Sequence, residues 1–368
     1  MPLELQFLPA SEGDAIWVRW GDDLRHQLLV DMGKGNTGTR IRGRLEALPE
    51  GDRHFELLVV THIDGDHIGG VISGLVERPP LSGLKLDDIW FNGWPHLHGK
   101  RVRRPGETGG LEPMGAVQGE LLSDWLTGPW NEHFDRGPIA REDPLRTVEL
   151  SDKLTLTVLG PTQTRLENLQ GTWADEVELA IEKGRLPESS RLESMGRPKP
   201  LRPDLTRRSD LNDLADEFTD PDDSPSNGTS ITLLLEWRKR RVLLTGDAFA
   251  EDVVDGLALL GEPSPVAVDV FKLPHHGSQG NVSDSLVRAV ASTDWVFSTN
   301  GTRHYHPDAT AVARVIRTAG EPRPRLLFNV PSEFNGWWTD PTWTSTFDYT
   351  TETGTADEGL TVTLEGRE

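Results

Sequence analysis

The feature that most constrains this chain is a group of candidate metal ligands directly after a short apolar segment. Residues 57–60, Leu-Leu-Val-Val, are predicted to form a buried strand, and residues 61–70 read Thr-His-Ile-Asp-Gly-Asp-His-Ile-Gly-Gly. Four titratable side chains therefore lie within six residues: His62, Asp64, Asp66 and His67. Carboxylates held this close repel each other and take up protons unless a cation neutralises them. The sequence thus predicts a strand end that presents a divalent cation site.

The ligand types narrow the choice of cation. Imidazole and carboxylate together favour zinc, manganese or iron over calcium, which prefers oxygen alone. The chain contains no cysteine, which excludes disulfides, thiolate metal sites and a cysteine nucleophile. The alternative interpretation of residues 61–70 is a polar turn around an Asp-Gly pair, but four ligand types in so short a stretch favour the metal site.

The chain of 368 residues is long enough for one large domain or two ordinary ones, and we expect a single globular domain over residues 1–368. Hydrophobic residues make up 35% and charged residues 26% of the chain, as in soluble proteins. No secretory signal and no run long enough to span a bilayer is visible, so we expect a cytoplasmic protein without a membrane partner. The formal net charge is −21, which opposes non-specific adhesion to DNA but leaves a nucleic-acid substrate open, because bound cations attract phosphate.

The strand and helix signals recur in two similar halves, which predicts two packed sheets with helices outside. Strands are expected at 3–8, 15–20, 27–31, 56–60, 88–91, 154–159, 230–237, 241–244, 268–273, 295–298 and 325–330. Helices are expected at 39–48, 68–75, 116–126, 163–183, 250–260, 283–291 and 309–318. Two weakly patterned regions remain, and we interpret residues 92–148 as a lid insertion and residues 184–228 as a flexible insertion.

Two further polar clusters each follow a predicted strand. Asp247, in Thr-Gly-Asp-Ala, is a metal ligand or the N-cap of the helix that begins near Phe249. His275 and His276 follow Pro274. Adjacent side chains on an extended backbone point in opposite directions, so we expect one imidazole to bind metal and the other to meet substrate or a carboxylate.

A third cluster and two single residues complete the candidates. His304 and His306 alternate on an extended segment, and Arg303 can clamp an anion, although a polar loop explains these residues equally well. Asp31 ends a predicted strand and is expected to hold a nearby histidine by a hydrogen bond. Asn227 is a turn residue, or a ligand if the site lacks one.

In motif order the chain resembles the metallo-β-lactamase-fold hydrolases, whose usual signature is His-x-His-x-Asp-His. This chain has His62-x-Asp64-x-Asp66-His67, with Asp in place of the second His. That variant is similar to the hydrolase domain of ComEC-type competence proteins, together with the motifs that follow it: Ile68-Gly69-Gly70, Thr245-Gly246-Asp247-Ala248, Pro274-His275-His276-Gly277-Ser278 and His306-Pro307. The resemblance spans about residues 3–335, and it implies a stand-alone soluble relative.

The resemblance implies an α/β fold, a four-layer αβ/βα sandwich with insertions, and one or two divalent ions, Zn or Mn, at the sheet edges. The implied ligands are His62, Asp64, Asp66, His67, Asp247 as the bridge, and His275 or His276. The family commonly has another histidine between the first motif and the bridging Asp. This chain has no histidine from 134 to 274, so Asn227, water or nothing takes that place.

The implied activity is hydrolysis by metal-activated water, most directly of a phosphodiester, with nucleic acid among the candidate substrates. Asp66 would orient the water, and the histidine of the 275–276 pair that does not bind metal would protonate the leaving group. His306 is a further catalytic candidate, and Arg303 and His304 are expected to bind substrate. The alternatives are a hydrolase of small esters, lactones or thioesters and, third, a metal-free binding module.

Overall fold

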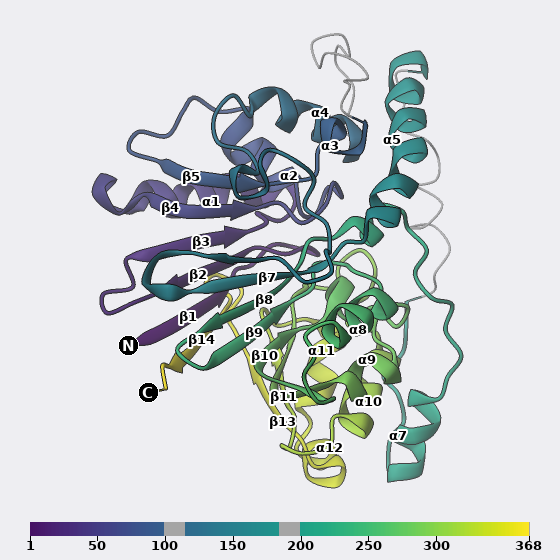
Figure 1. Cartoon of the computed structure of the whole chain (residues 1–368). Coiled ribbons are helices and arrows are strands. Elements are labelled where there is room, and N and C mark those ends of the chain that lie inside the picture. Colours follow the sequence, from purple (N-terminus) through teal and green to yellow (C-terminus); the bar gives the residue numbers. More distant parts are fainter. Residues whose placement is uncertain (99–114, 184–198, 368) are drawn as a thin grey trace.

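The computed structural model describes residues 1–98, 115–183 and 199–367 (Figure 1). Within these residues, no helix combines the length and the apolar character needed to cross a membrane. The chain forms two β-sheets packed face to face, with helices on both outer sides (Figure 1). This arrangement confirms the predicted four-layer α/β sandwich.

The first sheet has six strands in the order β14-β1-β2-β3-β4-β5. Its N-terminal strands form an antiparallel meander, whereas β3, β4 and β5 run parallel. The strands are β1 (Pro2–Phe7), β2 (Ile16–Trp20), β3 (His26–Val30), β4 (His54–Val59), β5 (Lys85–Trp90) and β14 (Leu360–Glu365).

The second sheet has eight strands in the order β13-β12-β11-β10-β9-β8-β7-β6. The strands from β9 to β13 are parallel, and those from β6 to β9 are antiparallel. The strands are β6 (Thr147–Glu149), β7 (Thr155–Gly160), β8 (Thr232–Trp237), β9 (Arg240–Leu244), β10 (Val266–Lys272), β11 (Val290–Phe297), β12 (Arg325–Phe328) and β13 (Thr350–Thr353).

Alternating apolar residues of both sheets fill the space between them. Leu57 of the first sheet and Val270 and Leu327 of the second belong to one buried cluster with 0% exposure. The opposite faces of the strands pack against helices, because residues i and i+1 of a strand point to different sides. Leu58 thus joins a separate cluster that contains Ile41 of a covering helix. Each sheet is buried on two faces, which explains the nearly continuous apolar runs in the parallel strands.

Helices cover the outer faces of the sheets (Figure 1). On the side of the first sheet these are α1 (Gly35–Ala47), α2 (Gly69–Val71), which continues into one π-helical turn at Ile72–Val76, α3 (Trp94–His98), α4 (Gly115–Trp125) and α5 (Gln163–Lys183). On the side of the second sheet they are α7 (Arg208–Ala215), α8 (Ala250–Ala258), α9 (Asp284–Ala289), α10 (Ala309–Thr318), α11 (Glu333–Gly336) and α12 (Pro341–Phe347).

The sequence reading missed several elements. It assigned nothing beyond residue 330, yet β14 pairs with β1 along six residues of register and closes the first sheet at the N-terminal strand. In the region interpreted as a flexible insertion, residues 184–198 lie outside the described residues. The remainder carries α7, whose Leu211 and Ala215 are buried in the core beside α10. In the region interpreted as a lid, residues 99–114 likewise lie outside the described residues.

Candidate metal centre

The candidate ligands meet because their loops leave the same edges of the two sheets. Asp31 and residues 61–67 follow the carboxyl ends of the parallel strands β3 and β4. Asp247 and the 275–276 pair follow the parallel strands β9 and β10. The carboxyl ends of parallel strands lie at the same edge of a sheet. Because the two sheets pack face to face, the loops that leave these edges meet at the candidate site.

One carboxylate oxygen, Asp247 Oδ2, lies at the middle of this site. The Nε2 atoms of four histidines surround it, at 3.3 Å for His67, 3.4 Å for His276, 3.9 Å for His62 and 3.9 Å for His275. Asp247 itself is 2% exposed. The site is thus built around a single buried oxygen shared by imidazoles from both halves of the chain.

Part of this cluster has the spacing of a zinc coordination sphere. His67 Nε2, His276 Nε2 and Asp247 Oδ2 form a triangle with sides of 3.3, 3.3 and 3.4 Å. Ligands about 2.0–2.1 Å from a tetrahedral ion are separated by about 3.3–3.4 Å. Asp66 Oδ2 lies 3.4 Å from His276 Nε2 and extends the set to four residues. The spacing of these atoms therefore fits one cation.

On the side of the site that His62 occupies, the candidate ligand atoms lie farther apart. His62 Nε2 lies 3.7 Å from Asp64 Oδ2 and 3.9 Å from Asp247 Oδ2. His62 Nε2 is buried and has no hydrogen-bond partner among the described residues. A buried imidazole nitrogen without a partner is costly, and a cation that it shares with Asp64 and Asp247 removes this cost.

Each of the four imidazoles has an oxygen atom at its Nδ1, which leaves Nε2 directed at Asp247. The partners are Thr61 Oγ1 at 3.0 Å for His62, Asp31 Oδ2 at 2.8 Å for His67, Asn281 Oδ1 at 2.9 Å for His275 and the Ser298 carbonyl at 2.9 Å for His276. Such partners set the tautomer and the ring orientation of metal-binding histidines. Asp31 thus lies where the sequence analysis expected it.

The expectation that His275 and His276 point in opposite directions is wrong. Both residues have left-handed backbones, with φ values of 45° and 56°, so the extended geometry behind that expectation does not apply. Both Nε2 atoms consequently face Asp247. Left-handed non-glycine residues cost about 1–3 kcal/mol each and are kept where the surrounding structure imposes them.

The pKa shifts of the site have two causes, the burial of its residues and the negative charge of its carboxylates. Burial and repulsion from Asp66 raise the pKa of Asp64 to about 7. Burial opposes ionisation of His67 and His276, but the nearby carboxylates, Asp247 above all, raise the pKa of both imidazoles well above 6.5. Burial and the charge of His67 lower the pKa of His62 to about 4, so its imidazole is uncharged at neutral pH. A divalent cation supplies the charge that these protons otherwise bring.

Two buried residues that the sequence analysis missed lie behind His276. Asp14 and Lys272 form an ion pair, and they are 1% and 0% exposed. Asp14 Oδ1 lies 3.6 Å from His276 Nδ1, and one potential ligand atom each from Asp14, His67, Asp247 and His276 lies within 4.8 Å of the others. Because Lys272 already neutralises Asp14, we interpret Asp14 as a support for His276. Lys272 ends the apolar strand β10, and a charged residue in that position is the sequence feature that could have indicated the buried ion pair.

Asp222, which the sequence analysis also missed, lies in the acidic run that precedes β8. Its Oδ2 accepts hydrogen bonds from Asn227 Nδ2 at 2.8 Å and Asn281 Nδ2 at 2.8 Å, and it lies 3.1 Å from His275 Nδ1. Asn227, a candidate ligand, therefore donates through its amide nitrogen to Asp222. The signal for Asp222 was absent from local sequence, because 53 residues separate it from His275.

The remaining candidates line one side of the site. The ring of His306 is buried and lies 5.5 Å from that of His275, and His304 stacks on His306 at 5.9 Å. Burial, followed by the charges of His306 and Arg303, lowers the pKa of His304 to about 4. Arg303 itself is exposed. These residues form a wall beside His275.

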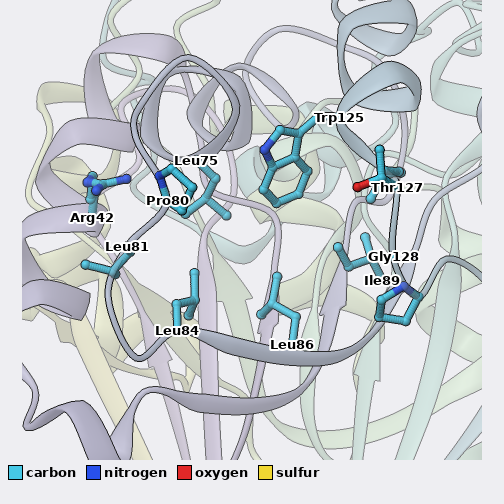
Figure 2. Close-up of a pocket in the computed structure, with 12 residues that line it drawn as sticks. Arg42, Leu75, Pro80, Leu81, Leu84, Leu86, Ile89, Trp125, Thr127 and Gly128 are labelled. Carbon is cyan, nitrogen blue, oxygen red and sulfur yellow. The ribbon is translucent and has the colours of Figure 1, made fainter.

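A separate cavity of about 310 Å³ lies on the outer side of the first sheet, away from these residues (Figure 2). Its lining is almost wholly apolar and includes Leu75, Leu84, Leu86 and Trp125. The guanidinium of Arg42 at its margin donates to the backbone carbonyls of Gly74 and Pro79. This cavity therefore has no group suited to hydrolysis.

The chain matches no family model and no curated protein sequence. Among solved structures, it is similar to one named as a metal-dependent hydrolase from Parabacteroides distasonis, with 10% identity, coverage of 89% of this chain and 93% of the other, and a TM-score of 0.39. It is also similar to CmlA, a diiron β-hydroxylase from Streptomyces venezuelae, with 11% identity and a TM-score of 0.42; 99% of this chain is covered, and it spans 54% of CmlA.

A third similar structure is a metallo-β-lactamase from Cronobacter sakazakii with a HARLDQ motif mutation. It has 12% identity and a TM-score of 0.31, with coverage of 73% of this chain and 75% of the other. Because all three TM-scores are below 0.5, none of these proteins indicates a function for this chain.

Proposed function

We propose that this protein is a metal-dependent hydrolase that acts on phosphodiesters. The observation that supports the proposal most directly is the arrangement of four imidazole Nε2 atoms within 3.9 Å of Asp247 Oδ2, with the carboxylates of Asp64 and Asp66 beside them. A carboxylate shared in this way suits two cations, and paired cations are typical of enzymes that cleave phosphodiesters.

Bound divalent cations lower the pKa of water and neutralise charge that develops on a phosphoryl group. The residues of the chain hold the cations and orient the reacting groups. Asp66 lies on the open side of the centre, since it is half-buried whereas His67 and His276 are buried, and it can accept a proton from the attacking water. His304 and His306 would confine the substrate on the side of His275. The ComEC-like Asp64 is the residue that favours a phosphodiester.

A hydrolase of small esters, lactones or thioesters is the second candidate. The start of α4 packs onto the ligand-bearing loop: a Cβ at Gly115 would lie 2.8 Å from the Ile63 carbonyl oxygen, and one at Gly65 would lie 3.4 Å from Gln118 Oε1. This wall limits the space beside the metal ligands, and the net charge of −21 opposes long polyanions. Both features favour a small substrate over duplex DNA.

The test uses protein loaded with Zn²⁺ or Mn²⁺ and three substrate classes. These are bis(p-nitrophenyl) phosphate, end-labelled single-stranded and duplex DNA, and a panel of p-nitrophenyl esters, lactones and thioesters. We expect cleavage of the phosphodiester, loss of that activity in Asp247→Asn, and no loss in the control Asp23→Asn, whose side chain is 65% exposed.

Three results would contradict the proposal in different ways. Cleavage of esters alone, lost in Asp247→Asn, would establish the second candidate. Hydrolysis unaffected by Asp247→Asn would mean that the reaction takes place elsewhere. Less than about one equivalent of transition metal in protein purified without chelator, with no activity after metal addition, would indicate a metal-free binding module.

A further inference from the structure

The two sides of the metal centre are built unequally. On one side, His67, His276 and Asp247 place their ligand atoms 3.3–3.4 Å apart. On the other side, the distances from His62 Nε2 to Asp64 and Asp247 are 3.7 and 3.9 Å. Three protein ligands with an open position suffice for a catalytic ion, but a looser set gains affinity from one more imidazole.

His275 is the fourth imidazole around Asp247 and lies outside the close-set triangle of His67, His276 and Asp247. Its Nε2 lies 3.9 Å from Asp247 Oδ2, the same distance as that of His62. Its side chain is 25% exposed, whereas that of His276 is 2% exposed, so His275 lies toward the opening of the site. Residues 134–274 contain no histidine, so the segment between the two halves supplies no further imidazole.

The surroundings of His275 resemble those of His67, whose Nδ1 faces Asp31. Asp222 Oδ2 lies 3.1 Å and Asn281 Oδ1 lies 2.9 Å from His275 Nδ1. A carboxylate at Nδ1 directs the lone pair of Nε2 at a metal and raises its basicity. The other carboxylate oxygen of Asp222, Oδ1, accepts a hydrogen bond from the backbone nitrogen of Ser224 at 3.0 Å.

Asn281 connects this arrangement to the bridging residue. Its Nδ2 lies 2.8 Å from Asp222 Oδ2, 3.2 Å from the Asp247 carbonyl and 3.3 Å from the Ala248 carbonyl. The backbone nitrogen of His275 also donates to the Gly246 carbonyl at 3.1 Å. His275 is therefore held relative to Asp247 both through its backbone and through its ring.

We propose that Asp222 holds His275 as the metal ligand that completes the side of the centre formed by His62, Asp64 and Asp247. The inference rests on the metal centre of the proposed function and concerns metal binding, whatever the substrate is. On this proposal, the segment before β8 contributes to the metal centre through Asp222.

The test measures metal binding directly. Metal-stripped wild type, His275→Ala, Asp222→Asn and the control Asp223→Asn are titrated with Co²⁺, whose visible absorption reports each ion bound, and dialysed against buffered Zn²⁺ for elemental analysis. Asp223 is an exposed neighbour in the same segment. We expect two equivalents in wild type and Asp223→Asn, one in His275→Ala, and a second ion bound about 10–100-fold more weakly in Asp222→Asn.

Retention of the first equivalent in His275→Ala shows that the variant is folded. If His275→Ala binds two ions with wild-type affinity, the inference is wrong and the proposed function is unaffected. The inference is equally wrong if Asn227→Ala, and not His275→Ala, loses the second ion, because the buried Asn227 Oδ1 would then be the ligand. If wild type binds no ion, the proposed function fails as well.

Discussion

His67 Nδ1 lies 2.8 Å from Asp31 Oδ2, and both side chains are completely buried. Thr61 holds the same carboxylate from the other side, because its amide and its hydroxyl donate to the two oxygens at 2.8 and 2.7 Å. Asp31 is therefore fixed before any cation binds. A fixed Asp31 holds the ring of His67 in one orientation, with Nε2 directed at the candidate metal site.

Replacement of Asp31 should weaken metal binding without removal of any ligand. Asp31→Asn keeps the shape of the side chain but loses the acceptor that sets the tautomer of His67. We expect about 10–100-fold lower affinity for Zn²⁺ in a competition titration with a chromophoric chelator. The exposed control Asp23→Asn should bind as wild type does. Equal affinities of the two variants would show that Asp31 does not orient His67.

The buried ion pair of Lys272 and Asp14 should contribute to the free energy of unfolding of the metal-free protein. Lys272→Met leaves the carboxylate of Asp14 buried without its cation, and such a loss costs about 3–5 kcal/mol. The double variant Lys272→Met with Asp14→Asn removes both charges, so most of the lost free energy of unfolding should return. Denaturant unfolding of both variants and of Asp14→Asn alone measures the coupling. Strict additivity would contradict a direct pair.

The stabilisation by metal should grow as the pH rises. The folded-state pKa of Asp64 is raised to about 7, and those of His67 and His276 are raised above 6.5. Bound protons therefore stabilise the metal-free protein at low pH, and this contribution is lost as pH rises through those values. Cations need the same groups deprotonated. The difference in Tm between Zn²⁺-loaded and chelator-treated protein should be larger at pH 8 than at pH 6; a constant difference would refute this.

Gly13 should prove essential to the ligand loop. A Cβ at this position would lie 1.7 Å from the backbone oxygen of Asp66. The substitution Gly13→Ala must therefore displace either the loop that carries Asp66 or the loop that carries residue 13. We expect lower metal content and a lower Tm. Gly43→Ala is the control, because a Cβ there meets nothing within 4 Å and the residue lies in α1. Alanine in a helix should stabilise that variant by about 1 kcal/mol. Similar effects of both changes would exclude the proposed clash.

Local sequence was sufficient to locate the strand ends and the candidate ligands that follow them. The apolar run before His62 and the run before Asp247 both form strands, as predicted, and each strand pairs in parallel with a neighbour in its own sheet. The helix at residues 163–183 has the predicted bounds. By contrast, β14 was not predicted, although Leu360–Glu365 alternates buried and exposed residues along most of its length.

Other features had no local signal. The left-handed backbones of His275 and His276 oppose the ordinary preference of L-residues, so an extended geometry was the reasonable expectation. Asp222 lay in a run of acids with low hydrophobicity, which is typical of solvated loops. Only its hydrogen bonds to Asn227 and Asn281 distinguish it from its neighbours.

The sequence by itself determined the chemistry that this protein can offer: imidazoles and carboxylates at the ends of buried strands, which are ligand types suited to a cation. The tertiary structure decided which of them lie close enough to share one. His67 and His276 are 209 residues apart, and their Nε2 atoms lie 3.3 Å from each other. That distance exists because two sheets pack with their carboxyl ends adjacent. A ligand set depends on distances in space, and residue types alone do not specify them.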